Sequence, residues 1–562
     1  MFDAIVVGSG MSGGWVAKEL TEKGFKTLVI ERGRKLEHGA DYKDSLNPWE
    51  LKNFGLVPEE EADEHYPVQK QCYAFSTANQ DFWVKDSDHP YTVADGKPFV
   101  WIRGYHLGGR SLMWGRQSYR MSPMDFESNA KDGHGSDWPI RYEDLAPWYD
   151  HVEEFAGISG SKEGLPQLPD GHFLPPMDLT GTEKDFKAKL EAAFPTRKLI
   201  IGRAAHLTKA QPIHEDLGRV SCQYRSLCER GCSYGAYFSS LSATLPAAER
   251  TGNLTIVTDA IVHSVIYDPK TGKATGVRVI DANTKEGRTY EAKVIFLNAS
   301  SIPTAQILLN STSEAFPRGL ANRSDAVGRY LMDHISAVGA GGTYPGFLDH
   351  FHHGRRPNGF YIPRYRNVTE KDETFLRGFG FQGGIMRGNW RSGMGKAGVG
   401  AEFKASLRQP GPWHVGLGGF GEMLPRPENR VTLNPAKVDK WGMPVVHIDA
   451  GLSDNEKKMI DRMRSDAREM LERAGVQDVQ VSGEHYGGLG LGIHEMGTAH
   501  MGKDPAKSVL NKYSQAHDVP NLFITDGSAM ASGGCQNPSL TYMALSARGA
   551  HYAAEFLKEG RI

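Results

Sequence analysis

The side chains best suited to catalysis lie near the C-terminus of the chain. His494 and His500 stand six residues apart in the segment IHEMGTAH, and Asn537 directly precedes Pro538. An imidazole accepts protons near neutral pH because its reference pKa is about 6.5, and a side-chain amide offers both donors and an acceptor. Together these groups could take the proton of a hydroxyl and hold its oxygen. Either histidine could be the base, and Asn537 could instead cap a helix predicted over 540–557.

Three cysteines form a second cluster of reactive groups. Cys222, Cys228 and Cys232 follow the pattern C-x5-C-x3-C. Three thiolates suit a three-iron four-sulfur cluster, with one cysteine for each iron, and nearby arginines would offset its negative charge. Buried free thiols, a disulfide or a zinc site are the alternatives, although no histidine lies close by in sequence to complete a zinc site. Cys72 and Cys535 are isolated, and we expect both to be buried thiols.

The first 31 residues carry a motif for a dinucleotide. The apolar run FDAIVV predicts a buried strand, GSGMSG a turn, and the next residues a helix and a second strand ending at Glu31. Gly8 permits a tight turn, Gly10 lets the backbone approach a pyrophosphate, and Gly13 allows close packing of helix on strand. The helix N-terminus favours phosphate, and Glu31 can accept hydrogen bonds from ribose hydroxyls. The motif indicates a dinucleotide without choosing between FAD and NAD.

Other elements must position these groups. The glycine- and aromatic-rich segment WIRGYHLGGRSLMWG (101–115) suits a loop pressed against a flat ring. Alternating apolar residues predict strands between 254 and 297. Mixed strands over 340–450 are typical of a second domain, and apolar spacing over 454–474 predicts an amphipathic helix.

Composition excludes several classes of protein. The chain has 562 residues and a formal net charge of −2, with 39% hydrophobic and 23% charged residues. A nucleic-acid partner would need a basic face, and no apolar run is long enough to make an integral membrane protein. The sequence opens directly on a strand rather than on an export signal. Five cysteines are too few for a disulfide framework in so long a chain.

In the order of its motifs the chain resembles the GMC (glucose–methanol–choline) oxidoreductases over nearly its whole length. The motifs are ERG at 31–33, GGRS at 108–111, NASSIPT at 298–304, GRYLMDH at 328–334, NRVTL at 429–433, IHEMGTAHMG at 493–502, NLFITDGS at 521–528 and NPSLT at 537–541. The resemblance implies an α/β protein: a Rossmann-like FAD-binding domain and a second α+β substrate domain built on an antiparallel sheet. We assign residues 1–45, 95–340 and 455–562 to the FAD-binding domain, and 46–94 and 341–454 to the substrate domain and covering segments.

The resemblance also implies roles for individual residues. His494 would be the base, rather than His500, and Asn537 would hydrogen-bond the reacting oxygen. The residues expected to contact FAD are Gly8, Gly10, Ser12, Gly13, Glu31, Arg32, Gly108, Gly109, Ser111, Met113, Trp114, Ala260, Ile261, Asn298, Ala299, Asp526, Gly527, Asn537, Pro538 and Thr541. Met113 stands where similar pyranose oxidases have a histidine bonded to FAD, so we expect FAD to be non-covalent. Asp526 could otherwise be a turn aspartate.

Within the family the chain is most similar to bacterial sugar dehydrogenases of the glucoside 3-dehydrogenase type and to pyranose oxidases. Asn537 stands where glucose oxidase has a second histidine. The similarity implies that a sugar or glycoside ring hydroxyl, at C3, is oxidised to a ketone by hydride transfer to flavin N5. Electrons would pass through a 3Fe-4S cluster on Cys222, Cys228 and Cys232 to a cytochrome c.

The same similarity bears on partners and compartment. It implies a small accessory subunit whose signal could carry the chain to the periplasm; without one we expect the cytoplasm. The alternative functions are an oxygen-using pyranose or C-glycoside oxidase without iron, a gluconate-type dehydrogenase, and a flavin-bearing lyase in which FAD is structural.

Overall fold

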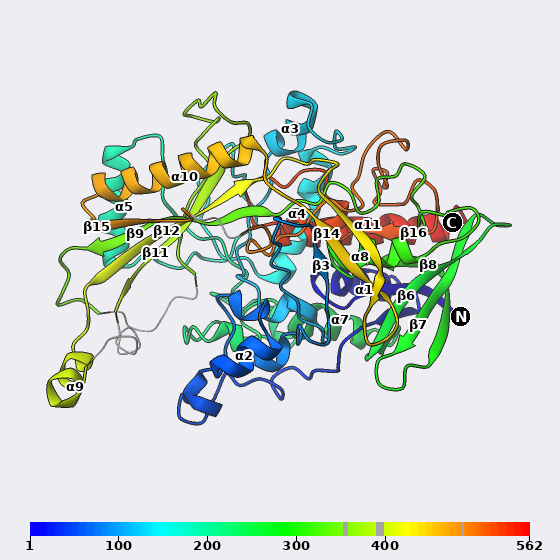
Figure 1. Cartoon of the computed structure of the whole chain (residues 1–562), viewed down its shortest axis with the longest axis horizontal. Helices are drawn as coiled ribbons and strands as arrows, with labels where there is room; N and C mark the ends of the chain where they lie inside the picture. Colours follow the sequence, from blue (N-terminus) through cyan, green and yellow to red (C-terminus); the bar gives the residue numbers. More distant parts are fainter. Residues whose placement is uncertain (352–357, 389–397, 485–487) are drawn as a thin grey trace.

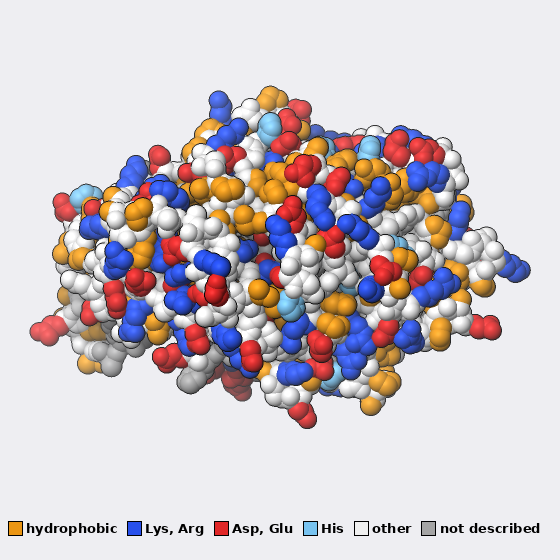
Figure 2. Space-filling model, turned by 90° about the horizontal axis from the view of Figure 1, so that it is seen from above, with side chains coloured by type: hydrophobic (Ala, Val, Ile, Leu, Met, Phe, Trp, Pro, Cys, Tyr) orange, Lys and Arg blue, Asp and Glu red, His pale blue; other side chains and the backbone are white. Residues whose placement is uncertain are grey.

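The computed structural model describes residues 1–351, 358–388, 398–484 and 488–562. Two large sheets lie next to each other, and both termini lie at the same end of the molecule (Figure 1). Acidic and basic side chains are interspersed over the face shown in Figure 2. Among the described residues, no helix is long and apolar enough to cross a membrane.

The first sheet contains the predicted dinucleotide unit. Five of its strands pair in parallel: β1 (Phe2–Val7), β2 (Thr27–Ile30), β5 (Leu254–Val257), β8 (Gly287–Leu297) and β16 (Leu522–Ile524). β6 (Ala260–Asp268) and β7 (Lys273–Asp281) extend it antiparallel along the first half of β8. The order is β5-β2-β1-β8-β7-β6, and β16 also pairs with β8. Residues 4–7 of β1 are buried, as expected for a central parallel strand.

Helices cover this sheet. α1 (Met11–Glu22) packs against the C-terminal α11 (Ser539–Lys558), which in turn packs on α4 (Tyr142–Ala156). α8 (Ser301–Asn310) follows β8. Further helices are α2 (Glu59–His65), α3 (Pro123–Asp132), α6 (Pro212–Glu215), α7 (Leu245–Arg250) and α9 (Gly400–Arg408). The helix predicted over 540–557 is thus present as α11, one residue longer at each end.

The second sheet is antiparallel, which confirms the predicted fold class. Its order is β15-β9-β12-β11-β10-β4. The strands are β4 (Ile200–Ile201), β9 (His334–Tyr344), β10 (Phe360–Ile362), β11 (Phe379–Arg387), β12 (Trp413–Glu422) and β15 (Gln477–Ser482). α10 (Asp454–Arg473) lies over it (Figure 1), starts at a Ser453–Glu456 capping box, and buries Met459, Ile460, Met463 and Met470 on its apolar side. A small sheet of β13 (Arg430–Val438), β14 (Pro444–Asp449) and β3 (Thr92–Val93) completes the fold.

Contacts cross the domain boundaries that we drew on the sequence. α5 (Gly181–Ala193) and β4 come from the segment assigned to the FAD-binding domain, yet they contact β11 and β10 of the second sheet. Conversely, Cys72, Phe82 and Trp83 of the covering segment 46–94 join a core cluster that contains Val6 and Val29. The two parts therefore share much of their packing.

Two glycines of the N-terminal turn have no room for a side chain. Gly8 has φ +95°, and a Cβ there would lie 2.4 Å from the Asn298 carbonyl oxygen. A Cβ on Gly13 would lie 1.9 Å from the Gly8 carbonyl oxygen. This is the close packing of helix on strand that the motif predicts.

We expect Gly13→Ala to destabilise the protein by about 1–3 kcal/mol, because the added methyl must displace the backbone of the turn. Melting temperature and the FAD content of the purified protein measure the effect. Gly287→Ala is the control, since a Cβ at this exposed position meets nothing within 4 Å. Equal melting temperatures for the two variants would contradict the packing argument.

Candidate active site

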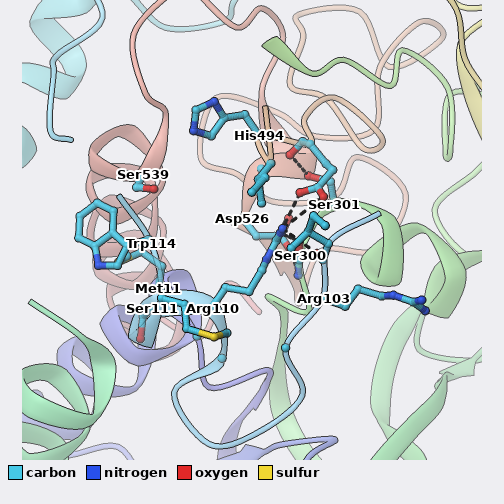
Figure 3. A pocket seen from close by; sticks show the side chains of 18 of the residues that line it. Met11, Arg103, Arg110, Ser111, Trp114, Ser300, Ser301, His494, Asp526 and Ser539 are labelled. Atoms are coloured by element: carbon cyan, nitrogen blue, oxygen red, sulfur yellow. Dashed lines mark hydrogen bonds and ion pairs between the residues drawn. The ribbon is translucent and has the colours of Figure 1, made fainter. Parts of the chain in front are cut away.

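A cavity of about 710 Å³ runs between the two large sheets. The β1–α1 turn, the 101–117 loop and the start of α8 form one side of it, while Ser336 of β9, Gln382 of β11 and Phe420 of β12 come from the second sheet. The loop around His494 and the N-terminus of α11 complete the wall. His494, Trp114 and Arg110 all line this space (Figure 3).

One end of the cavity fits the ADP part of a dinucleotide. Around Gly10 the backbone is open, because a Cβ there would approach only the Gly108 carbonyl oxygen, at 3.9 Å. The N-terminus of α1 is not capped by any described side chain. Arg32 Nε and Asn298 Nδ2 are buried on the cavity wall and have no hydrogen-bond partner among the described residues. Buried polar atoms of this kind need a partner, which a bound dinucleotide would supply.

Glu31 is held in place by the turn itself. Its carboxylate accepts hydrogen bonds from Ser9 N (3.1 Å), Ser9 Oγ (2.5 Å) and Gly33 N (2.9 Å). Burial raises the pKa of this carboxyl, while these donors lower it. Glu31 lines the cavity at the end of β2, where the motif predicts contact with a ribose.

Most of the predicted FAD contacts line the cavity. These are Gly8, Gly10, Ser12, Glu31, Arg32, Gly109, Ser111, Met113, Trp114, Ala260, Ile261, Asn298, Ala299, Asp526, Gly527 and Asn537. Among the described residues that line the cavity, four of the predicted FAD contacts are absent: Gly13, Gly108, Pro538 and Thr541. Gly108 N donates to Ser9 Oγ, and Thr541 Oγ1 bonds the hydroxyl of Tyr149. The FAD contacts expected of all four residues stay predictions. The hydrogen bonds of Gly108 and Thr541 lie behind the residues that line the cavity.

The Asp526 carboxylate is occupied by protein donors. Its Oδ2 accepts from Ser300 N (2.9 Å) and Thr304 Oγ1 (2.7 Å), and its Oδ1 accepts from the backbone and hydroxyl of Ser528. The side chain therefore joins the start of α8 to the segment after β16. Contact between residues 526–527 and FAD stays a prediction.

His494 and Asn537 face each other across the cavity wall. Asn537 Nδ2 lies 3.4 Å from His494 Nε2, and Asn537 Oδ1 accepts a 2.5 Å hydrogen bond from Gln382 Nε2. On its other side, His494 Nδ1 lies 2.9 Å from His334 Nδ1, and His334 Nε2 lies 2.8 Å from the Gly534 carbonyl oxygen. The predicted pair is thus brought together and joined to β9 and β11.

The Gly534 carbonyl determines where the protons lie. A carbonyl only accepts, so His334 carries its proton on Nε2 and its Nδ1 is an acceptor. His494 therefore donates from Nδ1, which leaves Nε2 unprotonated and directed at Asn537. An unprotonated ring nitrogen on a cavity wall, beside an amide donor, is the arrangement that removal of a hydroxyl proton requires.

Comparison with known proteins agrees with this site. Two GMC oxidoreductase family models match residues 2–336 and 425–546. The 2-methyl-1,2-propanediol dehydrogenase of Mycolicibacterium austroafricanum is 30% identical over 98% of this chain and 94% of that protein. The fructose dehydrogenase large subunit of Gluconobacter japonicus is 25% identical over 99% and 98%. The structure of pyridoxine 4-oxidase from Mesorbium loti superposes with a TM-score of 0.62 at 16% identity, over 98% and 99% of the two chains.

The chain belongs to the GMC oxidoreductase family. It is an FAD-dependent oxidoreductase that acts on CH–OH groups, as the resemblance predicted. FAD, when bound, supplies the acceptor for a hydride. The roles predicted for the residues of this GMC protein are that Asn537 would hold the substrate oxygen and His494 would take its proton.

The loop that carries His494 is fixed by a buried carboxylate. Asp333 Oδ2 accepts from the backbone of Gly490 (2.8 Å) and Gly492 (3.1 Å), and its Oδ1 accepts from the backbone of His494 (3.0 Å). Burial and the nearby Glu495 raise the pKa of Asp333 to about 7. Asp333 directly precedes His334. Two neighbouring residues therefore hold His494: Asp333 bonds its backbone and His334 contacts its ring.

Charges around the base favour its neutral form. Burial, together with His334 and Arg110, lowers the pKa of His494 well below its usual value. Arg110 itself is held by a bidentate pair with Glu495 (2.8 and 3.2 Å) and donates to Ser300 Oγ (3.1 Å). The cation therefore stays close to the cavity and disfavours a second positive charge on the imidazole.

His500 has a different place. Its Nε2 lies 3.0 Å from Ser136 Oγ and 3.1 Å from the Lys507 carbonyl oxygen, and the residue is 1% exposed. Only His494 of the two histidines lines the cavity in the described part of the chain. This geometry favours His494 as the base, as the family resemblance implied.

The cysteine loop borders the same cavity. Glu229, next to Cys228, is part of the wall, and Cys222 and Cys232 lie within electrostatic range of Cys228. All three are free thiols. Cys228 Sγ lies 3.6 Å from His206 Nε2, so a histidine remote in sequence does approach the cluster. Within the described ranges, no three His, Cys, Asp or Glu side chains converge closely enough to hold a metal ion.

Sequence reasoning missed several residues of the site. His334, Asp333 and Gln382 had no assigned role, although the first two end the GRYLMDH motif. The polar Asp-His pair inside that motif was the available signal. Gln382 lies in a glycine-rich strand, FGFQGGIMR, and no motif distinguishes it.

We expect His494→Gln to slow anaerobic flavin reduction by about 10²–10⁴-fold, because the proton acceptor is lost. FAD should stay bound, since the other predicted contacts are intact. The measurement is rapid mixing of holoenzyme with excess substrate. His500→Gln is the matched control: it disturbs buried contacts and lowers the melting temperature, but it should keep the reduction rate. The assignment is wrong if the two variants exchange these behaviours.

The lowered pKa of His494 predicts the pH dependence of flavin reduction. A protonated imidazole cannot accept the substrate proton, and a lowered pKa moves protonation to lower pH. The acid limb of the reduction rate should therefore have its midpoint below pH 6.5. A midpoint at or above 6.5, measured across buffers of equal ionic strength, would contradict the electrostatic account.

Proposed function

We propose that the protein is a dehydrogenase that oxidises a ring hydroxyl of a sugar or glycoside, at C3, to a ketone. The observation that carries the proposal is the series of contacts from Asn537 through His494 and His334 to the Gly534 carbonyl, from which an unprotonated Nε2 of His494 beside Asn537 follows. The substrate hydroxyl would insert between these two groups, accept from Asn537 Nδ2 and donate to His494 Nε2. His494 would take the hydroxyl proton, and FAD, once bound, would supply at N5 the acceptor for the hydride of the same carbon, which leaves the C=O bond of the ketone.

The polar lining of the cavity supports a substrate with several hydroxyls. Gln117, Asn358, Gln382 and Glu229 line it on the side of the second sheet and the cysteine loop, and Phe420 offers an aromatic surface near His494. Amides and a carboxylate pair well with sugar hydroxyls. Two relatives named for sugar substrates, the fructose dehydrogenase large subunit and a C-glycoside 3-oxidase from Microbacterium trichothecenolyticum (27% identical over 54% of this chain), also support this substrate class.

A small branched diol is the second candidate substrate. It is favoured by the 30% identity to 2-methyl-1,2-propanediol dehydrogenase over almost the whole chain. The same base and amide would act on either class, so the two candidates differ only in what the remainder of the cavity binds.

We also propose that Cys222, Cys228 and Cys232 hold a 3Fe-4S cluster that passes electrons to a cytochrome c. Two buried arginines support an anionic group here. Arg219 donates only to the backbone carbonyls of residues 235, 155 and 156 within the described chain, and burial lowers its pKa to about 9 while Cys232 raises it. Arg116 lies within electrostatic range of Cys228. To bind a cluster, the three cysteine sulfurs would have to lie closer to one another than they do as free thiols.

The proposal extends to partners and compartment. A large subunit among the relatives supports a small accessory subunit for this chain. Such a subunit would carry the export signal, and the assembled protein would then act in the periplasm with a cytochrome c as acceptor.

The substrate is tested by anaerobic titration of the holoenzyme with methyl glucosides, free sugars and 2-methyl-1,2-propanediol. We expect glucosides to bleach the flavin and yield a 3-ketone, identified by NMR. Bleaching by the diol alone would select the second candidate. Turnover in air that releases stoichiometric hydrogen peroxide, with no reduction of cytochrome c, would select the oxidase alternative. Absence of bleaching by any alcohol would favour a lyase.

The cluster is tested by iron analysis and EPR of aerobically purified protein. We expect about three irons per chain and a signal of an oxidised 3Fe-4S cluster. Cys228→Ser should lose the iron and cytochrome c reduction while keeping flavin reduction by substrate. Cys535→Ser is the control, since this buried thiol lies outside the loop. Iron-free wild-type protein that still reduces cytochrome c would refute the cluster.

A further inference from the structure

His334 lies directly behind the base and away from the substrate. It is the first residue of β9 and is 0% exposed. Its two ring nitrogens are both engaged, one with His494 Nδ1 at 2.9 Å and one with the Gly534 carbonyl oxygen at 2.8 Å. The two imidazoles meet edge to face, with centroids 4.9 Å apart and planes at 89°. A ring in this place can act on the substrate only through His494.

The other neutral arrangements of the two rings are all unfavourable. If His494 carried its proton on Nε2, two unprotonated Nδ1 atoms would face each other at 2.9 Å. If His334 carried its proton on Nδ1, its unprotonated Nε2 would face the Gly534 carbonyl. Each alternative sets two acceptors against each other in a buried site, where unpaired polar groups are costly. One backbone carbonyl therefore selects the tautomer of a ring two hydrogen bonds away.

The same contact helps after proton transfer. When His494 has taken the substrate proton it is a cation, and its Nδ1–H becomes a charge-assisted donor to His334 Nδ1. In the described residues, the His494 ring has no carboxylate among its hydrogen-bond partners; the Asp333 carboxylate bonds only the backbone of this residue. The neutral His334 is thus the group that receives the stronger hydrogen bond as the reaction proceeds.

We propose that His334 is a positioning residue that holds His494 as the Nδ1-protonated tautomer, so that Nε2 faces the substrate hydroxyl. The proposal rests on the proposed function only in taking His494 as the base, and it is independent of which alcohol is oxidised. Removal of the acceptor at position 334 lets the imidazole of His494 turn or change tautomer. An asparagine at 334 can still accept from His494 through its side-chain oxygen, whereas leucine cannot.

The experiment compares His334→Asn with His334→Leu as FAD-loaded proteins. We expect His334→Leu to slow the limiting rate of flavin reduction by about 10–100-fold, the usual effect of removing such an orienting partner. His334→Asn should recover most of that rate, and the substrate Kd from the same rapid-mixing data should change little in both. A role in packing alone predicts the reverse order, because leucine suits an apolar core better than asparagine. If His334→Leu does not retain FAD, His334→Phe replaces it.

His500→Asn and His500→Leu are the matched controls. This histidine is also buried and bonded to a backbone carbonyl, but it does not contact the base. The two controls should reduce flavin at similar rates. Equal rates for the two His334 variants, or rates that follow melting temperature, would overturn the proposal. The rates are taken with whichever alcohol reduces the wild-type flavin fastest, so a failure of the glycoside assignment leaves this comparison intact.

A second measurement needs no substrate. Diethyl pyrocarbonate acylates unprotonated imidazole nitrogens, and mass spectrometry locates the adduct. Wild type and His334→Asn should be modified at His494, because Nε2 is open to the cavity, and His334→Leu should be modified several-fold more slowly. An unchanged rate at His494 in His334→Leu would overturn the proposal even if no alcohol reduced the flavin.

Discussion

The site depends on one physical requirement: an imidazole must stay neutral, with one nitrogen free, on the wall of a buried cavity. Burial and the Arg110 guanidinium disfavour the charged form of His494. The hydrogen bonds that His334 accepts from His494 and donates to the Gly534 carbonyl then decide which nitrogen of His494 stays free. Neither effect alone suffices, because a neutral ring in the wrong tautomer offers the substrate a donor where an acceptor is needed.

The fold provides these conditions by placing the site where its two large parts meet. Asn537 is at the start of α11, which packs on the dinucleotide-binding sheet, while Gln382 and His334 belong to strands of the antiparallel sheet. Asp333 ties the His494 loop to the start of β9. The chain of hydrogen bonds thus crosses from one part to the other, and it couples the geometry of the base to the packing between them. Shared core clusters make that packing extensive.

Local patterns allowed much of this to be predicted from the sequence. The glycine turn with its flanking strands and the C-terminal helix follow from periodicity and turn chemistry. The antiparallel second sheet and the roles of His494 and Asn537 came from the family resemblance. Contacts remote in sequence escaped prediction. His334 contacts His494 although the two are 160 residues apart in the sequence, and His206 contacts Cys228 at a sequence separation of 22 residues. Asp526, a predicted FAD contact, lines the cavity, but the hydrogen bonds of its carboxylate with Ser300, Thr304 and Ser528 were not predicted. A sequence motif indicates that a residue is near a site without indicating which atom faces it.

The most direct test of the account is a crystal structure of the FAD-loaded protein with a non-reacting substrate analogue. The account predicts that the hydroxyl oxygen lies within about 3.2 Å of both His494 Nε2 and Asn537 Nδ2, with its carbon over the flavin N5. It predicts that His494 Nδ1 still contacts His334. A hydroxyl held by other residues, or a His494 ring turned so that Nδ1 faces the ligand, would contradict it.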